Sequence, residues 1–292
     1  MLPNTNAASD EDDNVLREKW AGLLTALLSA MRGSGDVKNA LRAMADVRLR
    51  QAWKSALDGF NIDEETARRL ITDKSPSKLS QEQIRQRDRL IAALNNLIDF
   101  ATCEEYQLYK EIEELEEDEE REWQEDDEAS LEPYLAKCKN YNETYAAVED
   151  ADISYAMSVA AVWIGVDESE TLTYMTQNDY RVRPWHMALQ GFTARKREFP
   201  DWMIPPIEWA CRCYLLTSTN EEIHGAANLK GVMAQSAPVR PKGMDGTFKE
   251  SVCNCGRIFS DEHPYFEVDD ADMPMLNGIV SELRTEYYGE KD

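Results

Sequence analysis

The apolar positions near the start of the chain recur at helical spacing. Asn14 can cap a helix that begins at Val15, and large apolar side chains follow at every third or fourth position until Met31. The segment Gly33-Ser34-Gly35 is typical of a helix end. This pattern predicts one amphipathic helix, preceded by a disordered acidic tail over residues 1–13.

Three further helical segments follow. One apolar stripe lies between Asp36 and Gly59, with the glycine as the expected stop, and a short helix is predicted over residues 64–72. Ser80 and Gln83 have the spacing of a capping box, in which each side chain bonds the other residue's backbone N–H, at the start of a long helix. With the first helix, these segments predict an antiparallel helical hairpin or bundle.

The continuation of the long helix is strongly acidic. Residues 104–128 hold fifteen acidic side chains against Lys110 and Arg121. Such a charge block is usually a solvated helix extension or an acidic linker. The alternative is a docking segment for a basic partner, because Tyr106 and Trp123 are among the apolar residues that interrupt the acids.

The pattern changes again after residue 130. Helices are predicted over 131–148 and 153–164, and alternating β-forming residues predict a strand over 171–176. Eight of the eleven prolines follow Asn178 and exclude long helices from most of that region. We therefore expect an α+β fold. Its expected parts are the tail at 1–13, a helical region at 14–129, a compact α+β domain at 130–270 and a C-terminal helix or tail at 271–292.

Composition bounds the class of protein. The chain has 292 residues, 42% of them hydrophobic, so it can bury a sizeable core. Its net charge of −24 argues against sequence-independent nucleic-acid binding over the whole surface and against an anionic membrane as partner. No apolar run approaches a membrane span, and the polar N-terminus lacks the features of a signal peptide. We expect a reducing cytosol, in which six cysteines indicate buried thiols or metal ligands, not disulfides.

Thiols and imidazoles concentrate late in the chain, where two C-x-C pairs and all three histidines follow residue 178. Zinc prefers four nitrogen or sulfur ligands in a tetrahedron. The candidate ligands of a zinc site are His186, Cys211, Cys213, Cys253, Cys255 and His263. The simpler interpretation is that these cysteines are core residues, since free cysteines are often buried.

Catalytic motifs are otherwise scarce. A nucleophilic cysteine needs a histidine and an orienting acid, and Cys211 or Cys213 with His186 is the pair to consider. The sequence has no phosphate-binding glycine loop and no H-E-x-x-H zinc motif. The sequence context therefore gives no support for a protease or for nucleotide binding by such loops.

Residues 181–197 oppose the global charge, with five basic side chains and no acid. The segment could face DNA, an acidic protein, or acids of the chain itself. The candidates for a partner or DNA contact are Arg195, Lys196 and Arg197.

A string of motifs in the second half resembles one known family. Asp179-Tyr-Arg-Val-Arg-Pro-Trp-His186 is followed by Gly191, by Trp202 with Pro205-Pro206, and by Trp209-Ala-Cys-Arg-Cys213. In this order and spacing, the string resembles the phage Mu F-like (MuF) head morphogenesis family of minor head proteins. The resemblance covers about residues 131–270, and its Trp, Pro-Pro and Cys-Arg-Cys elements are specific.

The resemblance implies a non-catalytic virion or procapsid protein that associates with the portal vertex during capsid assembly. It implies the portal, other capsid or scaffold proteins and phage DNA as partners, and a place in the virion after synthesis in the host bacterial cytoplasm. The family motif maps onto His186, Cys211 and Cys213 as metal-site or structural candidates. It maps onto these residues as structural candidates: Arg181, Arg183, Gly191, Trp202, Pro205, Pro206 and Trp209.

The chain also departs from the family pattern. The glycine that usually precedes the second motif tryptophan is replaced in Ile207-Glu208-Trp209, and the Cys253-x-Cys255 pair is not part of the pattern. Two alternatives therefore stay open. One is a zinc-dependent binding or hydrolytic module built on the Cys/His residues, and the other is an acidic scaffold or nucleic-acid mimic carried by residues 104–128.

Overall fold

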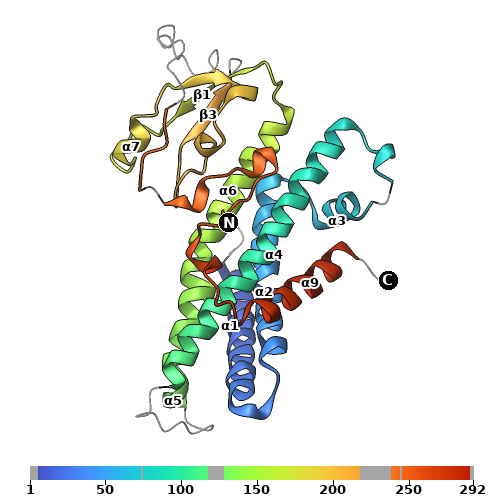
Figure 1. Cartoon of the computed structure of the whole chain (residues 1–292), viewed down its shortest axis with the longest axis vertical. Helices are drawn as coiled ribbons and strands as arrows, with labels where there is room; N and C mark the ends of the chain where they lie inside the picture. Colours follow the sequence, from blue (N-terminus) through green and yellow to red (C-terminus); the bar gives the residue numbers. More distant parts are fainter. Residues whose placement is uncertain (1–5, 74, 118–127, 218–237, 244, 290–292) are drawn as a thin grey trace. The chain divides into compact units, whose positions relative to one another are not determined.

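The computed structural model describes residues 6–73, 75–117, 128–217, 238–243 and 245–289. This part of the chain is mainly helical (Figure 1). It also contains a small antiparallel sheet made of β1 Thr171–Met175, β2 Thr193–Arg195 and β3 Tyr214–Thr217. The expected α+β class agrees with this architecture in its general form.

Internal contacts divide the chain into two compact units, each assembled from separated stretches of sequence. Unit 1 contains Met1–Arg50, Ile98–Ala147 and Tyr265–Glu286, and unit 2 contains Gln51–Leu97, Val148–Pro264 and Tyr287–Asp292. This division differs from the expected boundary near residue 130. Helices α2 Val37–Phe60 and α4 Gln81–Glu116 contribute to both units, and hydrophobic periodicity does not show which stretches of one helix pack together.

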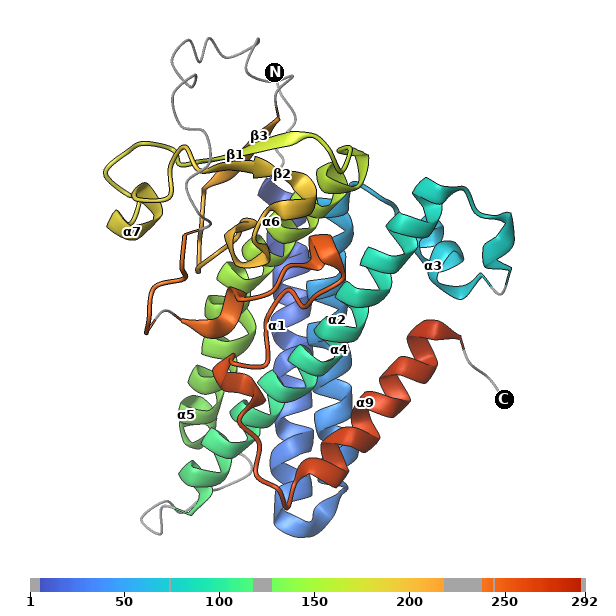
Figure 2. The same cartoon turned by 45° about the horizontal axis from the view of Figure 1, so that its top comes forward.

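Unit 1 is built from long helices. α1 Asn6–Ser29 runs into a π-helical turn, η1 Ala30–Ser34, and the first part of α2 returns antiparallel to it (Figures 1 and 2). Gly33 has a φ of 86°, which favours glycine, so the predicted helix end is confirmed. α1 begins at Asn6, inside the segment expected to be a disordered tail, and residues 1–5 of that segment lie outside the described residues.

A buried ion pair lies in the core of unit 1. The guanidinium of Arg48 on α2 donates to the carboxylate of Glu104 on α4 at 2.7 Å, and both side chains are fully buried. Glu105 is fully buried as well. Burying an unpaired charge costs on the order of several kcal/mol, which is a large fraction of the stability of a domain. The start of the acidic segment is therefore core, and the expectation of a solvated extension was wrong here.

Other acids of this segment are also held within unit 1. Three of them each accept hydrogen bonds from one lysine or arginine and one tyrosine: Glu111 from Lys137 and Tyr141, Glu113 from Lys110 and Tyr109, and Glu116 from Arg32 and Tyr134. Among the acids described between residues 104 and 117, Glu114 and Glu117 are the exposed ones. Residues 118–127 lie outside the described part of the chain.

The two helices predicted on either side of residue 150 are continuous. α5 Glu128–Lys139, a π-helical turn η3 Asn140–Tyr145 and α6 Ala146–Gly165 follow one another without a break. No glycine or proline lies between residues 146 and 164, so nothing in the sequence ends the helix there.

Unit 2 is organised around the sheet, which has the strand order β2-β1-β3. Leu172 of β1 pairs with Ala194 of β2, and Tyr174 of β1 pairs with Leu215 of β3. Helix α2 ends at Phe60, one residue past the predicted stop at Gly59, and the residue with left-handed backbone that follows is Asn61, with a φ of 57°. Gly59 itself lies against α6. A Cβ there would stand 2.0 Å from the carbonyl oxygen of Ser154.

The shorter elements match the sequence pattern closely. The helix predicted over 64–72 is α3 Glu64–Thr72, and the capping box is formed, with bonds of 2.9 and 3.2 Å between Ser80 and Gln83. The remaining elements are η2 Pro76–Lys78, α7 Pro184–Met187, η4 Lys196–Glu198, η5 Asp201–Met203, η6 Gly246–Phe248, η7 Val252–Asn254, η8 Pro264–Phe266 and α9 Met273–Tyr288. α9 lies in the segment expected to be a C-terminal helix or tail.

Candidate functional site

The residues that carry the family resemblance lie in unit 2, around two connections of the sheet. The chain leaves β1, forms α7 with His186, and turns back toward β2 at Gly191, which has a φ of 83°. The N–H of Gly191 donates to the carbonyl of Tyr174 at 2.9 Å. The second connection, from β2 to β3, ends with Cys211 and Cys213. The sheet therefore brings two distant motif segments to one place.

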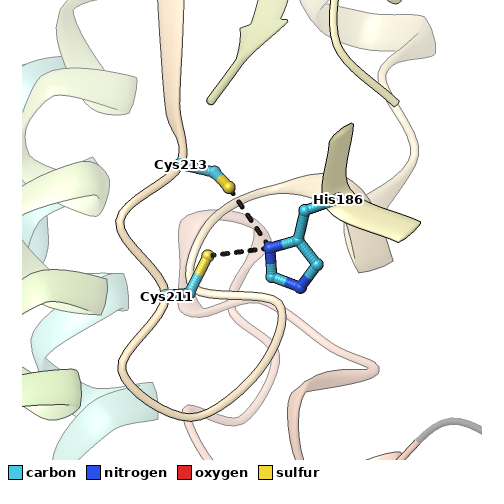
Figure 3. Close-up of side chains that lie close together, drawn as sticks. All are labelled: His186, Cys211 and Cys213. Atoms are coloured by element: carbon cyan, nitrogen blue, oxygen red, sulfur yellow. Dashed lines mark hydrogen bonds between the residues drawn. The ribbon is translucent and has the colours of Figure 1, made fainter. Parts of the chain in front are cut away.

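His186, Cys211 and Cys213 form a buried cluster (Figure 3). Nδ1 of His186 lies 3.3 Å from Sγ of Cys213 and 3.9 Å from Sγ of Cys211, and the three atoms lie within 4.8 Å of one another. Their exposed fractions are 2%, 2% and 5% for His186, Cys213 and Cys211. The structure thus brings together three of the six sequence-predicted metal ligands.

The other ring nitrogen of His186 faces a carboxylate. Nε2 lies 3.1 Å from Oε2 of Glu208, and Trp185 Nε1 donates to the same oxygen at 3.1 Å. Arg183 pairs with this oxygen at 3.0 Å and donates to the carbonyl of Trp209 at 2.7 Å. Charge-assisted bonds of this kind are strong, so Glu208 is firmly oriented toward the imidazole.

The backbone that presents the two thiols is also held. Tyr155 donates to the carbonyl of Cys213, and the side-chain amide of Gln177 donates to the carbonyl of Arg212 at 3.0 Å. The guanidinium of Arg212 makes a bidentate pair with Asp179 at 2.7 and 2.9 Å. The two cysteines lie just before β3, and both of their sulfurs lie near Nδ1 of His186.

The two thiols differ in acidity. The pKa of Cys213 is lowered to about 7, chiefly because the thiol of Cys211 donates to it. The nearby hydroxyl of Tyr174 and the charges of Arg183 and Arg212 act in the same direction, against burial. The pKa of Cys211 is raised because it donates to Cys213 and is buried.

This arrangement permits two kinds of chemistry. Cys213, His186 and Glu208 have the order of a nucleophile, a base and an orienting acid. A substrate would have to reach a sulfur whose residue is 2% exposed, so catalysis would require the site to open. One imidazole nitrogen and two sulfurs also form a donor set suited to zinc. A structural ion can be enclosed as the chain folds and then needs no repeated opening of the site.

Ala210 occupies a backbone conformation that favours glycine. Its φ is 53°, and its N–H donates to Oδ2 of Asp152 on α6 at 2.8 Å. Burial raises the pKa of Asp152 to about 6, although the bond from Ala210 lowers it. This bond ties the loop that carries the cysteines to α6.

The other three predicted ligands do not belong to the cluster. Cys253 is fully buried, whereas Cys255 is exposed at the end of η7. His263 packs against Trp209 and Phe259, with ring centroids 5.6 Å apart in each case. Burial lowers the pKa of His263 to about 4, so its ring is neutral at neutral pH and acts as part of an aromatic cluster.

The remaining motif residues have packing roles. Trp202 lies half-buried on η5, and Pro205 and Pro206 are buried and joined by a cis peptide bond. The ring of Trp209 packs on Phe248 and Phe259, with centroids 5.1 and 5.4 Å away.

The basic segment does not face outward as a whole. Lys196, a predicted partner or DNA contact, is 5% exposed, and its ammonium group binds Glu168 at 2.7 Å. It therefore stabilises the fold and is removed from the predicted contact surface. Arg195 and Arg197 are exposed, as is Arg181.

The sequence analysis did not predict Glu208, Tyr174 or Asp152 as site residues. Glu208 could have been nominated, because it stands beside Trp209 within the motif string. Tyr174 and Asp152 lie on β1 and α6, far along the chain from the cysteines, and no local pattern connects them to the cluster.

Comparisons of this chain with protein-family models, curated proteins and solved structures find no match. Within the described ranges, no helix combines the length and apolar character needed to cross a bilayer. The motif string and the site geometry are therefore the grounds for assigning a function.

Proposed function

We propose that this protein is a phage or prophage minor head protein that acts by contact, not by catalysis, at the portal vertex during procapsid assembly. One observation carries the proposal: the polar and sulfur-containing centre of the MuF-like string is buried in unit 2. His186 and both cysteines are buried, Trp209 joins an aromatic cluster, and Glu208 orients the histidine. A catalytic string would instead line an accessible cleft.

The proposed surface for the portal lies on unit 1. Glu114 and Glu117 are exposed near the end of α4, whereas most acids before them are engaged internally. In a chain of net charge −24, exposed acids favour encounter with a basic surface. The N-terminal helices and the acidic segment are therefore the proposed docking region.

Contact with DNA is proposed for a smaller surface on unit 2. Arg181, Arg195 and Arg197 are exposed, although Arg197 also pairs with Glu198 at 3.2 Å. Because DNA affinity grows with the number of phosphates that a protein neutralises, three guanidinium groups suit a contact with a few phosphates. They are too few to wrap a DNA duplex around the protein.

The burial of the cluster disfavours the alternative of a zinc-dependent hydrolytic module. A catalytic zinc keeps one ligand position open to water and substrate. Here the three donor residues are at most 5% exposed.

The test is co-expression of the full chain with the portal protein encoded by the same genome, followed by size-exclusion chromatography. We expect a complex that weakens as salt is raised. The double variant Glu114→Lys, Glu117→Lys should weaken it. The matched control Asp88→Lys, Asp270→Lys makes the same charge change at other exposed sites and should not.

Absence of a complex at every salt concentration would contradict the portal role. Equal weakening by both double variants would contradict the proposed docking region while leaving the portal role intact.

A further inference from the structure

We propose that His186, Cys211 and Cys213 bind one Zn²⁺ ion, which joins the α7 connection to the entry of β3. The ligand atoms are Nδ1 of the histidine and the two cysteine sulfurs. The ion has a structural role in unit 2. The inference stands independently of the portal proposal, because either can fail while the other holds.

The distances in the cluster are those of a nearly formed tetrahedral site. With a Zn–N bond of about 2.0–2.1 Å and a Zn–S bond of about 2.3 Å, a ligand nitrogen and a ligand sulfur stand about 3.6 Å apart. The two Nδ1–Sγ distances, 3.3 and 3.9 Å, lie on either side of this value. Side-chain shifts of a few tenths of an ångström, on the order of ordinary bond-length tolerance for metal sites, would complete the geometry.

Glu208 supplies an independent indication. A metal-bound histidine usually donates its second ring N–H to a carboxylate, which fixes the tautomer. Nε2 of His186 faces Glu208 at 3.1 Å, an arrangement that suits a metal-bound imidazole with its proton on Nε2 and its Nδ1 lone pair toward the sulfurs. Arg183 and Trp185 hold the carboxylate in this position.

A buried hydroxyl points to the same site. Tyr174 is fully buried on β1, and within the described structure its hydroxyl has no nitrogen or oxygen partner. The same hydroxyl interacts with the sulfur of Cys213, which is only a weak acceptor as a thiol. A metal-bound thiolate of Cys213 would be a stronger acceptor for this hydroxyl.

The donor set identifies the ion. Two thiolates and an imidazole select zinc over magnesium or calcium, which prefer oxygen ligands. Binding replaces the thiol protons of Cys211 and Cys213 with the ion, and these protons pass to solvent. The described part of the chain supplies three protein ligands, so a water molecule would take the fourth position. The burial of all three ligand residues leaves no path for a substrate and favours a structural role for the ion.

The first test uses the full chain, reduced and stripped with a chelator, and titrated with Co²⁺ and then Zn²⁺. We expect one Co²⁺ per chain, with the visible spectrum of a tetrahedral site and a thiolate-to-cobalt charge-transfer band. Zn²⁺ should displace the cobalt and raise the melting temperature. A stripped chain that is folded by circular dichroism and takes up no Co²⁺ would overturn the proposal.

Variants then locate the site. Cys211→Ser and Cys213→Ser should each weaken binding by more than about 100-fold, and Glu208→Gln by about 10–100-fold. The matched control Cys255→Ser changes an exposed thiol and should bind like wild type.

Thiol labelling of the wild-type chain covers the case in which ligand variants fail to fold. Added Zn²⁺ should protect Cys211 and Cys213 from alkylation, as located by peptide mapping. Protection of Cys253 and Cys255 instead would contradict the assigned ligands.

Discussion

Unit 1 and unit 2 bury polar groups in different ways. In unit 1 acids of α4 pair with basic side chains, as in the Arg48–Glu104 pair, and three of these acids also accept from a tyrosine. In unit 2 short elements and loops meet in a network around His186, with two sulfurs on one ring nitrogen and Glu208 on the other. The buried polar groups of unit 1 are thus spread along helices, whereas those of unit 2 converge on one imidazole from loops and short elements.

The largest expected effect concerns the buried pair. Arg48→Met removes the guanidinium that pairs with the buried carboxyl of Glu104, and breaking a buried pair typically costs about 3–5 kcal/mol of unfolding free energy. Urea denaturation at neutral pH measures it. As a control, Arg68→Met removes the exposed pair with Glu64 and should cost below about 1 kcal/mol. Equal effects of both variants would show that Arg48 and Glu104 are not buried together.

The aromatic cluster of unit 2 should respond next. Trp209→Ala removes contacts with Phe248, Phe259 and His263. Because Trp209 is only half-buried, we expect a loss of about 2–3 kcal/mol, below the cost for a fully buried tryptophan. Trp209→Phe should recover part of it. Wild-type thermal melting of Trp209→Ala would refute a packing role for this motif residue.

Acidification should destabilise the chain through His263. Its pKa is about 4 in the folded chain but ordinary, about 6.5, when unfolded. Below about pH 6.5 the unfolded state therefore binds more protons, and stability falls as pH is lowered toward 4. Asp152 acts in the opposite direction, because its folded pKa is raised to about 6. The histidine contribution between about pH 7 and pH 5 is about 1.5–2 kcal/mol.

The variant His263→Leu isolates this contribution. Between about pH 7 and pH 5, its loss of unfolding free energy in urea denaturation should be smaller than that of wild type by about 1.5–2 kcal/mol. An unchanged difference would mean that His263 titrates normally and is not enclosed by the aromatic rings.

The smallest expected effect is a gain of stability. Ala210 has a φ of 53°, where a side chain is strained and glycine is not. Glycine also loses more chain entropy on folding, so Ala210→Gly should stabilise by only about 0.5–1 kcal/mol. Ala188→Gly, at a φ of −66°, is the control and should not stabilise. A loss of stability in Ala210→Gly would contradict the left-handed backbone.

The sequence predicted local structure better than packing. The helix at 64–72, the capping box at Ser80 and the strand near 171 depend on neighbouring residues, and all three were confirmed. The packing of Gly59 and Glu104 depends instead on tertiary neighbours that are distant in sequence. Periodicity cannot show that Gly59 meets Ser154, or that a residue in an acid-rich run is buried beside an arginine.

The prediction of the Cys/His cluster was likewise correct for residues of one motif string and incomplete for tertiary contacts. The spacing of Cys211 and Cys213, with His186 in the same motif string, was sufficient to nominate three residues that meet. It could not exclude Cys253 and His263, because a second C-x-C pair and a nearby histidine look equivalent in sequence. Lys196 looked available for a partner, but only the fold shows its ammonium group bound to Glu168.

The central claim is that the MuF-like string supports the fold while exposed acids of unit 1 meet the partner. Amide hydrogen exchange of the full chain, alone and mixed with the portal protein, tests it most directly. The account predicts new protection near Glu114 and Glu117, with residues 183–213 equally protected in both samples. Protection that appears only within residues 183–213 would contradict it.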